Sequence, residues 1–167
     1  IVKHSSQCGV ASSATIQRAY EHAYACDTES AFGSIVGCNR PIDATLAKRL
    51  TETFLEAVLA PAIEPEAVAL LGKKPNVRVV TIEWPSPTAV PGQARIEWRS
   101  LLGGALLQEA DGSVGESHRV VTRRQPTPQE QQDLLFAWKA AKQVKSNGMV
   151  IARELATVGI GQGQPSR

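Results

Sequence analysis

The stretch AFGSIVGC, residues 31–38, decides the fold class because it is short, apolar and partly β-branched. A run of this kind between turn signals is typical of a strand buried on both faces, as in a sheet covered by helices. Soon after it, Asp43 begins a helix in which Leu46, Leu50 and Phe54 recur at spacings of four. A buried strand that is followed by a helix predicts an α/β fold.

The alternation of strands and helices continues on both sides of this stretch. Residues 1–3 predict the end of a strand, 5–9 (SSQCG) the turn that leaves it, and 12–25 a helix with Ser12 or Ser13 as N-cap. Downstream we expect a short buried strand, a helix that begins at a proline and a further strand, at residues 57–61, 65–71 and 77–82. This order is that of an α/β protein.

The second half of the chain changes character. Three prolines between residues 83 and 92 exclude a sheet ladder there and predict a surface loop. Three short strands are expected next, at residues 95–102, 104–109 and 119–122. Thr127 and Pro128 begin the clearest helix, and a last strand ends in a glycine-rich segment.

The composition limits the class of protein. With 167 residues and 43% hydrophobic content, the chain is long enough for one compact unit with a core. A net charge of +2 gives no general field for nucleic acid or an anionic membrane, and no apolar run approaches the roughly 20 residues of a bilayer span. Three cysteines without a C-x-x-C pair favour a reduced compartment, and we expect the cytoplasm. Because the chain begins at Ile1 rather than Met, we expect a piece of a longer protein.

Lys3 and His4 stand side by side where the first strand is expected to end. Adjacent strand residues point to opposite faces, so both can serve one site only where the backbone turns. At the carboxyl end of a strand in an α/β sheet, such a pair faces the crevice where ligands usually bind. An ordinary pair of surface residues is the competing interpretation.

Two further motifs lie near the end of the chain. In VGIGQGQPSR (158–167), alternating glycines let backbone N–H groups approach an anion while Arg167 adds a charge, although a tight turn is equally compatible. Asn147, at the end of VKSN, carries an amide that can hold another amide or a developing tetrahedral centre. A helix C-cap is the competing interpretation of Asn147.

The cysteines suggest weaker alternatives. Cys8 lies close to His4, which allows a thiol-imidazole nucleophile, but a small buried apolar residue is the favoured interpretation. His22 and Cys26 are spaced as two metal ligands on one helix, yet no further ligand pair accompanies them. We therefore expect no metal site.

The order of these motifs resembles that of the AICAR transformylase domain of bifunctional purine biosynthesis enzymes. The most specific blocks are DLLFAWK (133–139) with VKSN, and TVGIG-x-GQ-x-SR (157–167). The other matching blocks fall within residues 3–11, 23–36, 39–43, 54–61 and 98–108. The resemblance implies that residues 1–167 are the first part of that domain. It also implies a mixed sheet between helices in three layers, of the cytidine-deaminase-like type without its zinc residues.

The resemblance implies formyl transfer from 10-formyltetrahydrofolate, a co-substrate, to the 5-amino group of AICAR. Lys3 and His4 match the family's catalytic lysine and histidine, and Asn147 matches the asparagine of its SN motif. His4 would then act as a base on a weakly nucleophilic amine, while Lys3 and Asn147 stabilise the oxyanion. The expected partners are small molecules, AICAR and the folate.

Four more positions match residues of the family's AICAR site. Phe32, Gly33 and Glu56 match residues that line it. Arg167 matches an arginine that reaches the ligand from the neighbouring subunit, so a homodimer is expected for the full-length protein.

The chain departs from the family pattern near its proposed base. Ser6 and Gln7 replace an asparagine and a proline in the turn after Lys3 and His4, and Gln162 replaces a small residue. The changes at Ser6 and Gln7 predict a looser loop around His4. Because the family's domain continues beyond the SR motif, we expect this piece to be incomplete for catalysis. The alternative function is a nucleotide-monophosphate or folate binding module without catalysis.

Overall fold

The computed structural model describes residues 1–83, 96–111 and 118–163. The chain divides into two compact units, residues 1–84 with 124–167, and residues 85–123, and each is described by itself. The single unit expected from the sequence is therefore wrong. None of the helices in the described ranges is long and apolar enough to cross a membrane.

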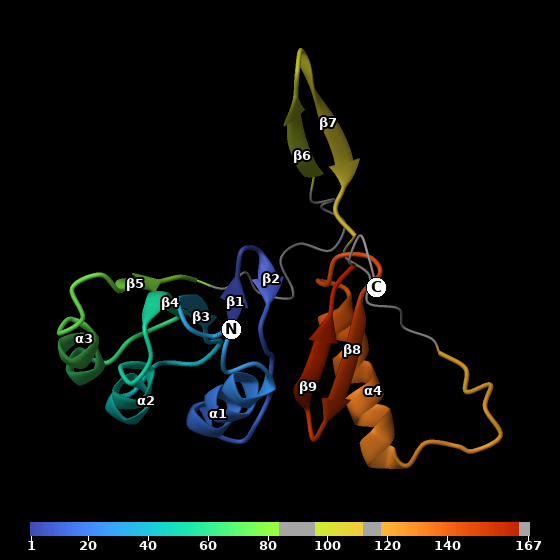
Figure 1. The fold of residues 1–167 in the computed structure, drawn as a ribbon, viewed down its shortest axis with the longest axis horizontal. Coiled ribbons are helices and arrows are strands. Elements are labelled where there is room, and N and C mark those ends of the chain that lie inside the picture. Colours follow the sequence, from blue (N-terminus) through green and yellow to red (C-terminus); the bar gives the residue numbers. More distant parts are fainter. Residues whose placement is uncertain (84–95, 112–117, 164–167) are drawn as a thin grey trace. The chain divides into compact units, whose positions relative to one another are not determined.

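The first unit is built on a mixed sheet of five strands in the order β2-β1-β3-β4-β5 (Figure 1). Its strands are β1 (Val2–Lys3), β2 (Ser6–Gln7), β3 (Ser34–Gly37), β4 (Leu55–Ala60) and β5 (Arg78–Thr81). β3, β4 and β5 run parallel, whereas β1 is antiparallel to both β2 and β3. The α/β fold with a mixed sheet is confirmed.

Three helices cover one face of this sheet (Figure 1): α1 (Ile16–Cys26), α2 (Ala44–Leu50) and α3 (Pro65–Leu71). The core includes the buried side chains of Tyr20, Val36, Ile42, Leu46, Leu50, Leu55, Val58 and Leu71. Ile35 and Val80, by contrast, are 41% and 42% exposed. In the described residues this sheet therefore has helices on one face, and the third layer expected from the sequence stays a prediction. The strand within residues 31–38 is buried on one face only.

The start of α1 differs from the expectation for a physical reason. The helix begins at Ile16 with Thr15 as its N-cap, and not with Ser12 or Ser13. Ser12 donates its N–H to the carbonyl oxygen of Leu155 at 2.8 Å. Together with the β-bridge between Ala11 and Ala156, this bond holds the segment before the helix as extended backbone alongside the β8–β9 hairpin, so the helix begins only at Ile16.

The next two helices follow the sequence more closely. Asp43 caps α2 as predicted, since its Oδ1 accepts the N–H of Leu46 at 2.7 Å. The helix ends at Leu50, so Phe54 lies outside it and directly precedes β4. α3 has the predicted bounds, with Pro65 in its first turn.

The first unit also contains α4 (Pro128–Ala141) and an antiparallel hairpin of β8 (Met149–Arg153) and β9 (Ala156–Gly161). α4 begins as predicted, with a capping box in which Thr127 and Glu130 each bind the other's backbone N–H. Arg124 donates two hydrogen bonds of 2.9 Å to the Glu130 carboxylate and lowers its pKa to about 2.

In the second unit, β6 (Ile96–Leu101) pairs with β7 (Gly104–Glu109) across a two-residue turn. These are two of the three strands predicted there. The third, at residues 119–122, is wrong, because within the described ranges those residues join no sheet ladder. Most of the predicted proline-rich loop lies outside the described residues.

Candidate active site

Lys3 and His4 stand at a sharp reversal of the chain. Lys3 pairs with Ser6 across the first hairpin, which leaves His4 and Ser5 as a two-residue turn. The φ angles of these two residues are 52° and 61°, as the tightest hairpins require. The turn expected over residues 5–9 is wrong in extent, because the reversal comes earlier and its second strand begins at Ser6.

This turn does not lie at the carboxyl ends of the parallel strands, where the sequence analysis expected it, but at their amino ends. Because β1 runs antiparallel to β3, the carboxyl end of β1 lies at the amino ends of β3 and β4. Ligands of open α/β sheets usually bind at the carboxyl ends of the parallel strands. Lys3 is instead close to the segment that enters β3.

The ammonium group of Lys3 is fixed to that segment. Its Nζ donates a hydrogen bond of 2.7 Å to the carbonyl oxygen of Phe32. Gly33 has a φ of 72°, which favours glycine, and a Cβ there would lie 3.9 Å from the Lys3 Nζ and 3.7 Å from the Phe54 ring. The structure therefore brings three predicted residues together: Lys3, Phe32 and Gly33.

Phe32 and Phe54 form an exposed aromatic pair beside Lys3. Their ring centroids are 5.5 Å apart with the planes tilted by 46°, and the residues are 60% and 39% exposed. Exposed ring faces of this kind can pack against a flat ligand ring. Sequence analysis missed Phe54 because its spacing fitted the preceding helix. The signal that could have identified Phe54 is its position directly before the strand β4.

Glu56 lies at the same end of β4 as Phe54. Its carboxylate accepts a hydrogen bond of 2.8 Å from Arg78 on the neighbouring strand β5. The two side chains are 47% and 71% exposed, so this ion pair contributes little to stability. The carboxylate of Glu56 remains partly accessible from solvent.

The glycine-rich segment contacts the segment that carries Asn147. Gly163 donates its N–H to the carbonyl oxygen of Lys145 at 3.3 Å, and a Cβ on Gly163 would overlap the carbonyl oxygen of Ser146. Only glycine fits at that position. Asn147 is exposed just before β8, and its Oδ1 accepts a hydrogen bond of 3.2 Å from Ser146 Oγ. Arg167 lies outside the described residues.

The glycine-rich segment also reaches the hairpin of Lys3. Ser6 Oγ donates to Gln162 Oε1 at 2.9 Å across 156 positions of the chain. Gln7 Nε2 donates to the carbonyl oxygen of Ala140 in α4 at 3.3 Å. These three polar side chains are the ones that depart from the family pattern. They connect the hairpin to its surroundings, while the looser loop expected from Ser6 and Gln7 stays a prediction.

Asp133 of α4 holds the turn between β8 and β9. Its carboxylate accepts the N–H of Glu154 at 3.0 Å and that of Leu155 at 2.8 Å. The hydrogen bond from Leu155, followed by that from Glu154, lowers the pKa of Asp133. Both turn residues have left-handed backbone, with φ of 53° and 57°. Sequence analysis missed this contact, since an aspartate in an exposed helix carries no local sign of a distant turn.

The cysteine alternatives receive little support. Cys8 is buried, and its burial raises the pKa of the thiol, which disfavours the reactive thiolate. Its Sγ lies 3.7 Å from the carbonyl oxygen of Ser30. In the part of the chain that the structure describes, no cluster of three His, Cys, Asp or Glu side chains could hold a metal ion, and this part includes His22 and Cys26.

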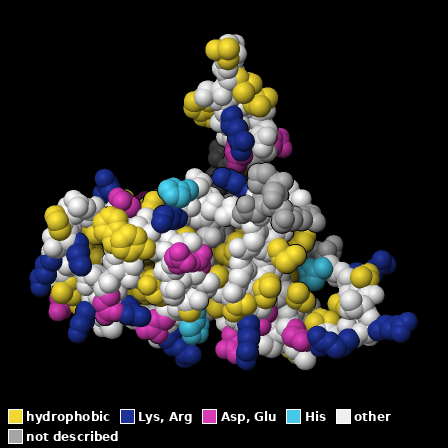
Figure 2. Space-filling view, viewed as in Figure 1, with side chains coloured by type: hydrophobic (Ala, Val, Ile, Leu, Met, Phe, Trp, Pro, Cys, Tyr) yellow, Lys and Arg dark blue, Asp and Glu magenta, His cyan; other side chains and the backbone are white. Residues whose placement is uncertain are grey.

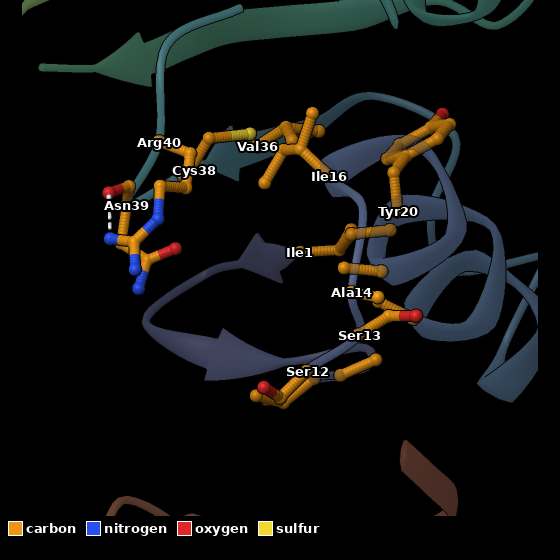
Figure 3. Close-up of a pocket in the computed structure, with 15 residues that line it drawn as sticks. Ile1, Ser12, Ser13, Ala14, Ile16, Tyr20, Val36, Cys38, Asn39 and Arg40 are labelled. Atoms are coloured by element: carbon orange, nitrogen blue, oxygen red, sulfur yellow. Dashed lines mark hydrogen bonds between the residues drawn. The ribbon is translucent and has the colours of Figure 1, made fainter. Parts of the chain in front are cut away.

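A cavity of about 490 Å³ lies at the carboxyl end of β3 (Figure 3). Its walls are mixed in polarity and include the side chains of Ile16, Tyr20 and Val36. The guanidinium of Arg40 donates to the carbonyl oxygen of Asn39 beside it. Its lining residues include none of those predicted for the site. The cavity and the Lys3 hairpin are thus at opposite ends of β3.

The model of the AICARFT/IMPCHase bienzyme family matches residues 1–167. The chain belongs to this family. The bifunctional purine biosynthesis protein PurH of Nostoc punctiforme is 46% identical over 169 residues, which cover 100% of this chain and 32% of the relative. PurH of Cereibacter sphaeroides is 46% identical over 170 residues, which cover 100% of this chain and 31% of the relative. PurH of Enterococcus faecalis is 45% identical over 168 residues, which cover 99% of this chain and 32% of the relative. The chain thus spans about a third of the length of these relatives.

Proposed function

We propose that this chain contributes the formyl-transfer site of a purine biosynthesis enzyme. The reaction moves a formyl group from 10-formyltetrahydrofolate to the 5-amino group of AICAR. The observation that carries the proposal is the meeting of three motifs in a member of this family. Ser6 binds Gln162, and Gly163 binds Lys145, so the hairpin of Lys3, the glycine-rich segment and the segment of Asn147 converge.

His4 is the proposed general base. The acceptor amine sits beside a carboxamide on an imidazole ring, so its lone pair is delocalised and it attacks weakly until a base removes its proton. Attack forms a bond from the amine nitrogen to the formyl carbon and leaves an oxyanion. Collapse of this intermediate breaks the bond to the folate nitrogen, which takes up a proton. The exposed position of His4 in a tight turn supports this role, because a substrate can reach its ring.

Lys3 and Asn147 are proposed to stabilise the oxyanion. A fixed cation and an amide donor lower the barrier most when they need not reorganise during the reaction. The hydrogen bond from Lys3 Nζ to the carbonyl oxygen of Phe32 supports this role, since it holds the ammonium in place before substrate arrives.

Other residues are proposed to bind AICAR. Phe32, Gly33 and Glu56 would line its site, and the exposed rings of Phe32 and Phe54 suit a flat imidazole. Arg167 would reach the ligand from a second subunit of a homodimer. We also propose a cytidine-deaminase-like subdomain as the fold and the cytoplasm as the location.

The test is His4→Ala in the full-length gene product that contains these residues. The rate of formyl transfer should fall on the order of 10²–10⁴-fold, as for loss of a general base. AICAR binding, measured by calorimetry, should stay within a few-fold. Cys8→Ser is the matched control and should retain activity.

Three other outcomes would change the proposal. Activity retained by His4→Ala within a few-fold would remove the base assignment. A wild-type protein that binds AICAR or the folate but transfers no formyl group would be a binding module. Loss of activity in Cys8→Ser with an intact fold would favour a thiol mechanism.

A further inference from the structure

Strand β4 contains one residue more than its pairing with β3 requires. Ser34 of β3 lies opposite Leu55. The next residue, Ile35, lies opposite Ala57, so Glu56 has no partner on β3. The described ladder between β4 and β5 begins at Ala57, so Glu56 has no partner there either. Glu56 is therefore the extra residue of a β-bulge, a feature that often lies beside functional sites and redirects a side chain.

The bulge determines to which face of the sheet Glu56 is directed. Leu55 is buried in the core, on the face that the helices cover. Arg78 pairs with Ala57 and lies with it on the helix-free face, where Ile35 is exposed. Hydrophobic side chains are uncovered around β4 and β5 in Figure 2, with acidic and basic side chains beside them. Because the carboxylate of Glu56 accepts its hydrogen bond from Arg78, it is directed to this open face.

Arg78 binds one oxygen of the Glu56 carboxylate and leaves the other available. Its Nη1 donates to Oε2 at 2.8 Å, whereas Oε1 accepts no hydrogen bond from any of the described residues. A carboxylate oxygen of this kind can accept an N–H or O–H from a bound molecule. The guanidinium also offsets the negative charge of Glu56, which would otherwise repel an anionic nucleotide. The ion pair thus presents an oriented acceptor with its charge balanced.

This acceptor belongs to the same strand end as the aromatic pair of the candidate site. Phe54 precedes Glu56 by two residues, and its carbonyl oxygen accepts the N–H of Gly33 at 2.8 Å. Phe32, whose ring packs against that of Phe54, is the residue before this glycine. The start of β4 therefore combines an aromatic surface with a polar acceptor, which suits the ring of a nucleotide and its N–H or O–H donors.

We infer that Arg78 is a positioning residue of the AICAR site, which holds the carboxylate of Glu56 so that its second oxygen accepts a hydrogen bond from the substrate. The inference rests on the proposed function, in which Glu56 lines that site. Arg78 acts through Glu56 and touches no reacting atom. It therefore supports the binding of AICAR and not the chemical step of formyl transfer.

Kinetics of the full-length gene product test this role. Arg78→Ala should raise the KM for AICAR on the order of 10-fold, while kcat stays within about 3-fold because Lys3 and His4 are unchanged. Arg78→Lys retains the charge and one donor, so its KM should stay within about 3-fold of the wild-type value. Arg153→Ala is the matched control, since it removes another exposed arginine from an ion pair, with Glu154, and should have no effect.

A double-mutant cycle shows whether Arg78 acts through Glu56. In the Glu56→Gln background, Arg78→Ala should raise the KM by less than about 2-fold further, since no carboxylate remains to be held. An equal effect of Arg78→Ala in both backgrounds would overturn the inference, as would an unchanged KM in the active protein or a fall in kcat alone.

Thermal denaturation separates positioning from a structural role. The midpoint of Arg78→Ala should stay within about 2 °C of the wild-type value, as expected for an exposed ion pair. A larger fall in the midpoint would make the role of Arg78 structural and would overturn the inference.

Calorimetry separates this inference from the proposed function. If the wild-type protein binds AICAR but transfers no formyl group, the proposed function fails, while the roughly 10-fold weaker AICAR binding expected for Arg78→Ala still tests the ion pair. If the wild-type protein neither binds AICAR nor transfers a formyl group, both are overturned.

Discussion

Two hairpins of the first unit share an unusual turn and are held in different ways. His4 and Ser5 connect β1 to β2, and Glu154 and Leu155 connect β8 to β9, with left-handed backbone at all four non-glycine residues. Such a conformation costs roughly 1–2 kcal/mol per residue and persists only where the surroundings enforce it. The two turns therefore need explanations that lie outside their own sequences.

The turn between β8 and β9 is bound directly by a side chain, whereas the turn between β1 and β2 is held only through residues of the strand that follows it. Asp133 accepts both N–H groups of the turn between β8 and β9. Within residues 1–83, 96–111 and 118–163, no side-chain hydrogen bond to the backbone of His4 or Ser5 is found, and the first hairpin is tied through Ser6 and Gln7 in β2. Because no side chain binds the backbone of this turn in the described residues, the His4 side chain stays accessible, which its proposed role as a base requires.

Removal of the Asp133 carboxylate should have the largest effect on stability. Asp133→Ala deletes two charge-assisted hydrogen bonds and should lower the free energy of unfolding by about 1–2 kcal/mol, the scale of a lost helix cap. Chemical denaturation at neutral pH measures it. Gln129→Ala, which removes only a weak neighbour of Asp133, is the control and should change little.

The pH dependence of stability isolates the charge of Asp133. Its pKa is lowered in the folded chain, so the folded state binds the proton less readily than the unfolded state does. The stabilisation is complete above the ordinary pKa of 3.8 and is lost as the pH falls through the lower folded value. Asp133→Ala should abolish this part of the acid destabilisation. If the difference in free energy of unfolding between variant and wild type did not change across that pH range, the charge of Asp133 would not be what stabilises the turn.

Local signals in the sequence predicted the elements whose ends are determined locally. Pro65 and Thr127 mark helix starts through their own backbone and side chains, and both predictions are confirmed. Ser12 looked like an equally good cap, yet its N–H is bound by Leu155, a partner far along the chain. Residues 119–122 had the composition of a strand, but among the described residues they join no sheet ladder.

The same limit applies to the candidate site. The family resemblance predicted that Lys3, Phe32 and Gly33 belong together, and the structure brings them into contact. The contact of Ser6 with Gln162 spans 156 positions, so no local pattern could reveal it. Taken separately, Ser6 and Gln162 each looked only like a departure from the family pattern.

The contact between Ser6 and Gln162 should have an intermediate effect. Ser6→Ala and Gln162→Ala should each lower the free energy of unfolding by about 0.5–1 kcal/mol, and a double-mutant cycle should show that most of this energy is shared. In the full-length gene product, both variants should lower the rate constant of formyl transfer more than they raise the KM for AICAR, because the hairpin that carries His4 loses a tether. Strictly additive effects on stability would mean that the hydrogen bond does not couple the two segments.

Relief of backbone strain should give the smallest effect and separate the two turns most clearly. Ser5→Gly and Leu155→Gly each remove a Cβ from a left-handed position, which is favourable, but each also adds entropy to the unfolded chain. The net gain in the free energy of unfolding should be about 0.5 kcal/mol or less for either variant, measured by thermal and chemical denaturation. Formyl transfer should respond differently, because Ser5→Gly frees the turn that aims His4, whereas Asp133 still holds the other turn after Leu155→Gly. Equal activity of the two glycine variants would contradict the idea that the first turn positions a catalytic base.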